Sequence, residues 1–152
     1  NVLLACKSLR PQIQYIISGG TPDGDPDFKK IAANGWYFQW CPVRDEIFAL
    51  SNLLVIRGGH TVISQAIQFG KPMLTIPIEN HGEQIGNSEK VAKIGLGMMI
   101  PSAHINPKKI VEAVHHLLDD HSFHDRATDV MKLSSDLDGI DNIVNIIRPY
   151  LK

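Results

Sequence analysis

Short apolar, β-branched stretches alternate with stretches of helical period along the first two thirds of the chain. The strand-type stretches are apolar at nearly every position, as in parallel strands that helices cover on both faces. The predicted strands are Gln12–Ser18, Trp36–Trp40, Leu53–Ile56, Met73–Pro77 and Leu96–Ile100. The predicted helices between them are Asp27–Ala33, Val43–Leu50, His60–Phe69 and Glu83–Ile94. This alternation predicts an α/β fold with a doubly wound, Rossmann-like parallel sheet.

The last third of the chain predicts helices alone. Asn106 is a favourable N-cap residue, and Pro107 suits the first position of a helix that ends at Asp119. A second helix is predicted over Phe123–Ser134, and a third starts near Asp138. An apolar stripe on the third helix, typical of packing in a core or against another domain, consists of Ile140, Ile143, Val144 and Ile147.

The first residues, Asn1–Ser8, have the character of the end of a helix that leads into the first predicted strand. In an open α/β sheet, a strand normally precedes such a helix. We therefore expect residues 1–152 to be one domain of a longer protein, with its first strand upstream of Asn1.

Composition narrows the class of protein. The 152 residues are 43% hydrophobic and 20% charged, which is typical of one globular domain. Fifteen basic residues against sixteen acidic ones, without a basic stripe, exclude a large nucleic-acid footprint. Cys6 and Cys41 lie far apart in apolar stretches, as buried thiols do in a reducing compartment. We expect a cytoplasmic protein.

The most informative segment joins a predicted strand to a helix and contains Arg57, Gly58 and Gly59. Glycines let the backbone approach a ligand, and the N-terminus of the following helix suits a phosphate. Arg57 adds a cation, and His60 and Thr61 add hydrogen-bond donors. The alternative is a strand-to-helix turn that needs glycine only for packing.

A polar loop follows the next strand and brings Glu83, Gln84 and Asn87 into one helical turn. A carboxylate beside two amides can bind several hydroxyls, as a sugar presents them. The alternative is that Glu83 only complements the helix N-terminus. Both loops follow the carboxyl ends of neighbouring strands, where α/β sheets bind ligands. Together they favour a nucleotide-sugar.

Four groups of residues, in combination, carry a family resemblance. They are Trp40-Cys41-Pro42, the strand into Arg57-Gly58-Gly59, Gly70-Lys71-Pro72 with Ile76-Pro77, and Glu83-Gln84-Ile85-Gly86-Asn87. Because of these residues, the chain resembles the carboxyl-terminal, donor-binding domain of GT-B glycosyltransferases. The resemblance covers nearly the whole chain. The similar families are the bacterial MurG-type N-acetylglucosamine transferases, the UDP-glycosyltransferases and archaeal relatives. The resemblance implies an inverting hexosyltransferase that uses a UDP-sugar such as UDP-N-acetylglucosamine, without a metal or another cofactor.

The resemblance also implies how the residues after the Leu53–Ile56 strand bind the nucleotide. Arg57 occupies the position of a basic residue near the donor diphosphate, and the loop of Gly59, His60 and Thr61 contacts that diphosphate through its backbone. The family usually has a glutamate eight residues after the basic position, where it binds both ribose hydroxyls. This chain has Gln65 there, so we expect one strong ribose hydrogen bond and one weaker one.

Other matched positions concern the sugar and the base. Glu83 and Gln84 occupy the pair that holds the sugar hydroxyls. Trp40 and the backbone near Cys41 match the segment that recognises the base. The catalytic base of such enzymes belongs to an amino-terminal acceptor-binding domain, so we expect no catalytic residue in this chain and no activity from the chain alone.

Two alternative functions share this donor site. One is a UDP-sugar epimerase of the same fold, and the other is a stand-alone donor-binding subunit of a split transferase. The partner is then either an amino-terminal domain or a separate subunit, and a peripheral membrane contact would lie in that part.

Two weaker features have simpler interpretations. Four histidines and three aspartates near residues 115–125 could hold a metal, but they flank a predicted helix break and favour a solvated surface. They are His115, His116, His121, His124, Asp119, Asp120 and Asp125. The segment Ser18-Gly19-Gly20 could line the base pocket, although a plain turn is the simpler interpretation.

Overall fold

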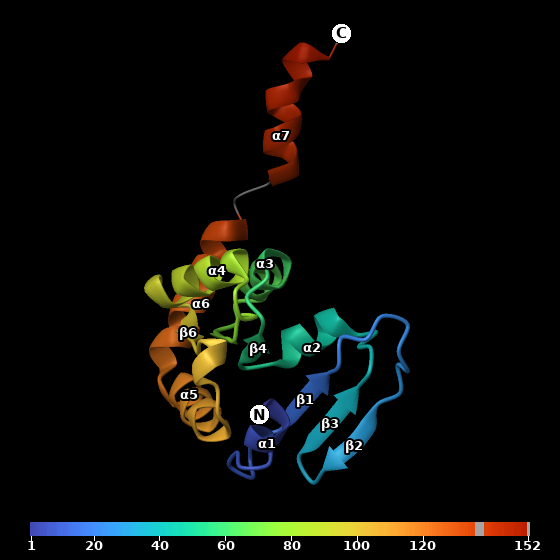
Figure 1. The fold of residues 1–152 in the computed structure, drawn as a ribbon. Coiled ribbons are helices and arrows are strands. Elements are labelled where there is room, and N and C mark those ends of the chain that lie inside the picture. The colour runs from blue at the N-terminus through green and yellow to red at the C-terminus, as the bar shows by residue number, and fades with distance from the viewer. Residues whose placement is uncertain (136–138, 152) are drawn as a thin grey trace.

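The computed structural model describes residues 1–135 and 139–151 (Figure 1). The strands are β1 (Tyr15–Ser18), β2 (Lys29–Ala32), β3 (Gly35–Phe38), β4 (Leu54–Ile56), β5 (Met73–Thr75) and β6 (Gly97–Met99). The α-helices are α1 (Val2–Cys6), α2 (Arg44–Leu50), α3 (His60–Gln68), α4 (Gly82–Lys93), α5 (Pro107–Asp119), α6 (His121–Ser135) and α7 (Gly139–Ile147). Short 3₁₀ turns lie at η1 (Ser102–His104) and η2 (Arg148–Tyr150). The predicted α/β class and all five predicted strands are confirmed, with shorter bounds.

The strands form two hydrogen-bonded sheets of three, and not the single sheet that the sequence predicts. One has the order β4-β5-β6 and is parallel throughout. The other has the order β1-β3-β2, with β1 parallel and β2 antiparallel to β3. Within the described residues, β1 and β4 are therefore edge strands.

The prediction of a helix over Asp27–Ala33 is wrong, because this segment forms β2. Its pairing with β3 places Lys30 opposite Trp36. The Phe28 ring stacks on the Trp36 ring with centroids 5.9 Å apart, and the Lys30 ammonium lies 5.9 Å from the same ring. These cross-strand contacts favour a strand over a weak local helix pattern.

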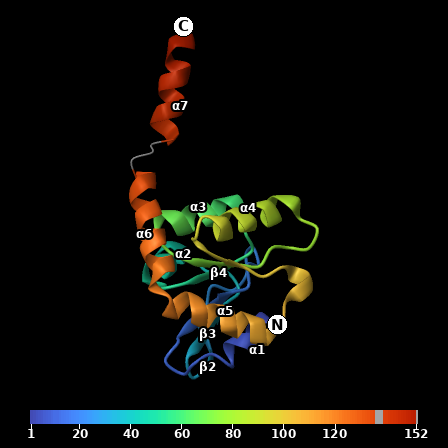
Figure 2. The ribbon, with the colours of Figure 1, turned by 90° about the vertical axis from the view of Figure 1, so that its left-hand side faces the viewer.

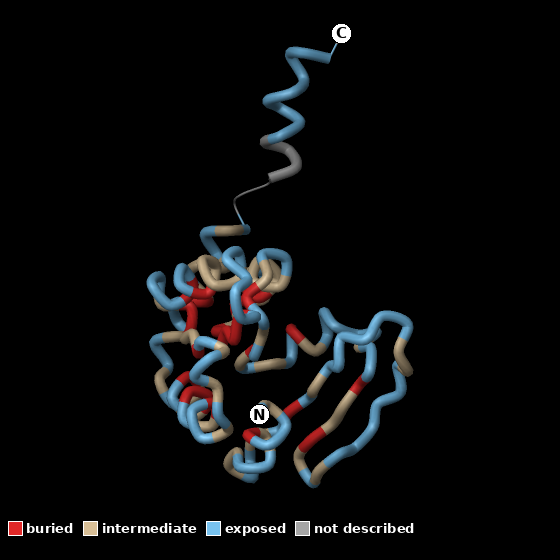
Figure 3. Tube along the Cα trace, viewed as in Figure 1, coloured by how far each residue is buried: buried red, intermediate tan, exposed pale blue. Residues whose placement is uncertain are grey.

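The β4-β5-β6 sheet is the middle of three layers. Figure 2 shows α3 and α4 on one side of β4, with α5 and α1 on the other. Met73 and Leu74, successive residues of β5, are both 0% exposed and belong to two different core clusters. Figure 3 colours the buried residues of the chain red. Met73 packs with Ala66 of α3 and Val91 of α4. Both faces of β5 are therefore sealed, as the apolar sequence predicts.

Helix ends follow the predicted capping chemistry. The Asn106 side chain accepts a hydrogen bond from the Lys109 backbone N–H at 2.9 Å, and Pro107 is the first residue of α5. Helix α3 ends just before Gly70, whose φ of +60° glycine adopts readily.

Helix α7 extends away from the rest of the chain in both ribbon views (Figures 1 and 2). Its apolar residues Ile143, Val144 and Ile147 are exposed, so they do not belong to the core of the described chain. The predicted start near Asp138 and the side chain of Ile140 lie outside what the structure describes. Of the described helices, none combines the length and the apolar character that crossing a bilayer requires.

Replacing Leu74 with alanine should leave a cavity between β5 and α5. We expect the free energy of unfolding to fall by about 2–5 kcal/mol. The control Leu133→Ala alters a side chain that is 66% exposed on α6, and we expect a change below about 0.5 kcal/mol. Urea unfolding of both variants measures the difference, and equal losses would contradict the core assignment.

Candidate functional site

The two predicted loops leave the same edge of one sheet. β4 and β5 are parallel neighbours with Ile56 opposite Thr75. Arg57, Gly58 and Gly59 follow β4, and the polar loop follows β5 and enters α4. The structure thus confirms that these loops lie at the carboxyl ends of neighbouring strands.

Gly58 passes close to helix α4. Its φ is +85°, a left-handed conformation that glycine adopts without strain. A Cβ atom on Gly58 would lie 2.4 Å from Ser88 Oγ and 2.9 Å from the Gln84 carbonyl oxygen. Ser88 is 0% exposed and cannot move aside freely. Only glycine lets the chain pass this close to α4.

Asn87 ties the same loop to α4 through its amide. Asn87 Nδ2 donates to the Gly58 carbonyl and to Glu83 Oε1, each at 3.4 Å. In a trans peptide unit the N–H points opposite to the C=O. Since the Gly58 carbonyl faces Asn87, the N–H of Gly59 in the same peptide unit faces away from α4.

The N-terminus of α3 has no side-chain cap, whereas α4 is capped by His81 and α5 by Asn106. A Cβ atom on Gly59 would have no described heavy atom within 4 Å, apart from its chain neighbours and its own helix backbone. The side chains of Arg57, His60 and Thr61 are exposed around this end. Unpaired helix N–H groups beside a cation suit an anionic ligand.

Some polar side chains of the loop after β5 and the start of α4 form hydrogen bonds within the protein. Gln84 Oε1 accepts a hydrogen bond from the Ile78 N–H at 3.0 Å, and His81 Nδ1 accepts one from the Gln84 N–H at 3.4 Å. Asn87 bonds Glu83 and Gly58, as above. The Glu83 carboxylate is exposed, and the Gln84 amide nitrogen has no bond among the described side chains. The Glu83 carboxylate and the Gln84 amide nitrogen are therefore available to form hydrogen bonds with ligand hydroxyls.

Gln65 lies in α3, five residues after His60, the first residue of the helix. Its Oε1 is buried and has no hydrogen-bond partner among the described residues. A buried acceptor without a donor costs about 1–3 kcal/mol. Because this oxygen is buried, a ligand hydroxyl could reach it only after the Gln65 side chain moves, and the ribose role of Gln65 stays a prediction.

Trp40 and Cys41 follow β3 in the other sheet. Trp40 is 46% exposed, and Cys41 is a partly buried free thiol. No hydrogen bond or ion pair between described residues links them to the loops after β4 and β5. The structure brings together residues 57–61 and 83–87, while the base-recognition role of Trp40 and Cys41 stays a prediction.

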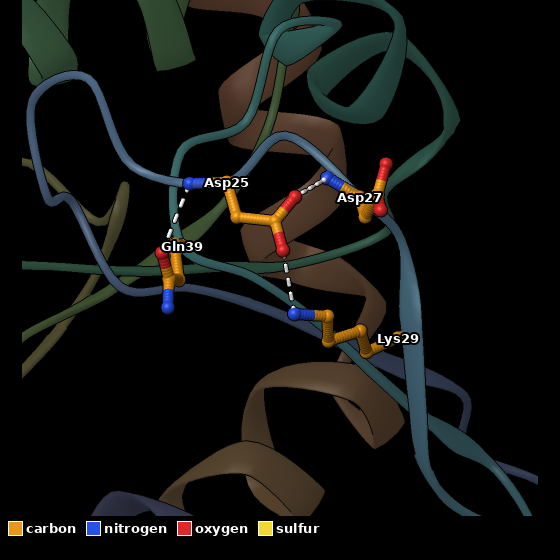
Figure 4. A network of polar contacts seen from close by, with 4 residues as sticks. All are labelled: Asp25, Asp27, Lys29 and Gln39. Atoms are coloured by element: carbon orange, nitrogen blue, oxygen red, sulfur yellow. Dashed lines mark hydrogen bonds and ion pairs between the residues drawn. The ribbon is translucent and has the colours of Figure 1, made fainter.

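A polar network of Asp25, Asp27, Lys29 and Gln39 holds the loop before β2 (Figure 4). Asp25 Oδ1 and Oδ2 accept hydrogen bonds from the Asp27 N–H at 2.9 Å and Lys29 Nζ at 2.6 Å. The Asp25 N–H donates to Gln39 Oε1 at 2.9 Å, and the Asp25 carbonyl accepts from the Trp40 N–H at 3.4 Å. The Lys29 hydrogen bond holds the pKa of the Asp25 carboxyl below its ordinary value.

In the histidine-rich region around residues 115–125, His115 and Asp119 both interact with Arg10. His115 Nε2 accepts a hydrogen bond from the Arg10 N–H at 3.4 Å, and Arg10 pairs with Asp119 at 2.6 Å. This ion pair holds the pKa of the Asp119 carboxyl below its ordinary value. Within the described ranges, no group of three or more possible ligands is placed to hold a metal ion.

The fold matches that of the carboxyl-terminal domain of GT-B glycosyltransferases. The model of the glycosyltransferase family 28 C-terminal domain matches residues 11–143. The chain belongs to this family.

Relatives extend this assignment. An "uncharacterized glycosyltransferase" of Methanosarcina mazei is 30% identical over 90% of the chain and 36% of its own length. A UDP-N-acetylglucosamine–N-acetylmuramyl-(pentapeptide) pyrophosphoryl-undecaprenol N-acetylglucosamine transferase of Lachnoclostridium phytofermentans is 26% identical, over 93% of the chain and 40% of its own length. The chain thus spans about two fifths of these relatives.

A solved structure has the same fold. The crystal structure of the glycotransferase of kitacinnamycin superposes with a TM-score of 0.84 at 20% identity. The match covers 99% of this chain and 39% of that one. The GT-B carboxyl-terminal fold is therefore confirmed over both three-stranded sheets.

Two adjacent glycine variants test the close approach at Gly58. Gly58→Ala should lower the free energy of unfolding by at least about 1–3 kcal/mol, from the left-handed φ alone. Gly59 has a φ of −67° and open space at its Cβ position, so Gly59→Ala should cost less than about 1 kcal/mol. Thermal or urea unfolding compares them. Equal effects would contradict both the left-handed conformation of Gly58 and its close approach to Ser88 and Gln84.

Asp25 should make the loop at Trp40 sensitive to acid. Because the folded pKa of Asp25 lies below its ordinary value of 3.8, the network stabilises the loop above that pH. The stabilisation disappears as pH falls through the lower folded pKa. Asp25→Asn should already speed amide exchange at Trp40 at neutral pH. Asp23→Asn is the matched control in the same loop, and equal exchange in both variants would refute the role of Asp25.

Proposed function

We propose that this chain is the donor-binding domain of an inverting, metal-independent hexosyltransferase that uses a UDP-sugar of the N-acetylglucosamine type. One observation carries this proposal. The Asn87 amide donates to the Gly58 carbonyl, so the Gly59 N–H points away from α4 at the uncapped N-terminus of α3, and the neighbouring Arg57 is exposed. A diphosphate fits that arrangement of donors and charge.

The groups beside the phosphate position support a sugar and a ribose. Exposed Glu83 and the free amide nitrogen of Gln84 follow the adjacent strand, where they can bind sugar hydroxyls. Gln65 on α3 would bind a ribose hydroxyl only if its side chain turned to bring the unpartnered, buried oxygen to the surface. The name of the Lachnoclostridium phytofermentans relative, which uses UDP-N-acetylglucosamine, supports the choice of donor.

The remaining parts of the reaction belong outside this chain. We propose that an amino-terminal acceptor-binding domain or a partner subunit supplies the acceptor site and the catalytic base. Any peripheral membrane contact would also lie there. With free Cys6 and Cys41, a reducing, cytoplasmic location is the one we propose.

Arg57→Ala tests the diphosphate assignment. A charge-assisted contact is worth about 1.5–3 kcal/mol, so UDP affinity should fall about ten- to hundred-fold. Uridine, which has no phosphate, should bind the variant as it binds the unmodified protein.

Calorimetric titration of UDP and uridine into the whole protein makes this comparison. Arg148→Ala, which removes the same charge from η2 after α7, is the control and should leave both affinities unchanged. Equal losses for UDP and uridine in Arg57→Ala would remove Arg57 from the phosphate site.

A further inference from the structure

Gln39 is an exposed residue that directly follows β3, at the carboxyl end of that strand. β3 is parallel to β1, and helix α2 joins β3 to β4. Helical connections of this kind join strands that run in the same direction. The carboxyl end of β3 therefore lies at the same edge as the carboxyl end of β4, where the candidate donor site is.

The hydrogen bonds around Gln39 fix which end of its amide faces outward. The Asp25 N–H donates to Gln39 Oε1 at 2.9 Å. A backbone N–H bonds the oxygen of a side-chain amide and not its nitrogen, so the two ends of the Gln39 amide are distinguished. In Figure 4 Gln39 Nε2 points away from Asp25, and no described residue accepts a hydrogen bond from it. The network therefore holds an unused donor at the carboxyl edge.

The backbone groups beside this donor already have partners. The Trp40 N–H donates to the Asp25 carbonyl at 3.4 Å, and the Gln39 carbonyl accepts a hydrogen bond from the Thr21 N–H at 3.1 Å. The Trp40 side chain is 46% exposed, and an exposed aromatic ring is a surface on which a planar base stacks. Gln39 Nε2 thus remains as a hydrogen-bond donor next to a residue suited to stacking.

The order of the strands decides which part of a nucleotide would meet Gln39. In Figure 1 β1 lies between β4 and β3, and the proposed diphosphate position follows β4. A nucleotide with its diphosphate there and its base toward β3 presents to Gln39 the end of the base that is farthest from the ribose. In a pyrimidine this end is C4, which lies opposite the ring nitrogen that carries the ribose.

We propose that Gln39 Nε2 donates a hydrogen bond to the C4 carbonyl of a pyrimidine base and thereby selects a 4-keto pyrimidine over cytosine. Uracil shares with thymine a carbonyl acceptor at C4, whereas cytosine has an amino donor there. Two donors that face each other cannot bond, and both lose their hydrogen bonds to water. This inference rests on the donor site proposed above and specifies which bases that site accepts.

Gln39→Glu tests this role, because a carboxylate keeps an acceptor for the Asp25 N–H and replaces the outward donor with a second acceptor. The added charge weakens UDP and CDP alike, so the ratio of their affinities isolates the effect on the base. The unmodified protein should bind UDP at least about tenfold more tightly than CDP, and Gln39→Glu should lower that ratio about tenfold or more. Calorimetric titration of both nucleotides into the whole protein measures the ratio.

Two further variants complete the test. Gln39→Ala removes the donor without adding charge, and it should bring the affinities for UDP and CDP to within about threefold of each other. Gln14→Glu makes the same chemical change at an exposed position before β1, at the opposite end of the strand. This control should keep the ratio of the unmodified protein. Thermal unfolding shows that each variant is folded before it is titrated.

The outcomes separate the role of Gln39 from the donor site itself. UDP binding with a ratio that neither Gln39 variant changes would overturn the proposal and leave the donor site in place, and so would equal binding of UDP and CDP by the unmodified protein. An unmodified protein that binds neither nucleotide would instead refute the donor site, and the role of Gln39 with it.

Discussion

The close approach of Gly58 to α4 is the constraint on which the candidate site depends. A left-handed Gly58 passes over buried Ser88, and Asn87 fixes the Gly58 carbonyl. Those contacts determine where the Gly59 N–H points and where α3 begins. They also connect the loop after β4 to the start of α4, which follows β5, so that the proposed phosphate position and the proposed sugar position lie side by side. A side chain at residue 58 would disturb both positions at once.

Local chemistry made much of this predictable from the sequence. Buried strands showed as apolar runs, and Asn106 with Pro107 marked the start of α5. Glu83 and Asn87, four residues apart, share a helix face by geometry alone. The two glycines after β4 indicated a tight turn, although the sequence did not show which of them needs to be glycine. The structure assigns that need to Gly58, because only there would a Cβ atom collide with α4.

Features that depend on distant partners could not be predicted in this way. β2 is a strand because it pairs with β3, with Lys30 and the preceding Phe28 against the Trp36 ring, and its own sequence favoured a helix. Asp25 bonds Gln39, which is 14 residues away, and Ser88 meets Gly58 only after both loops fold. The division of the strands into two sheets could not be predicted either, because the pairing of a strand depends on partners distant in the sequence, which no local pattern specifies.

The proposed donor site depends most directly on the N-terminus of α3, and amide chemical shifts in the whole protein can test it. On titration with UDP, the amides of Gly59, His60 and Thr61 should shift strongly, and uridine should shift them far less. The amides at the capped start of α5, Lys108 and Lys109, serve as the internal reference and should stay unchanged. UDP shifts that miss the start of α3, or that affect α5 equally, would contradict the proposed donor site.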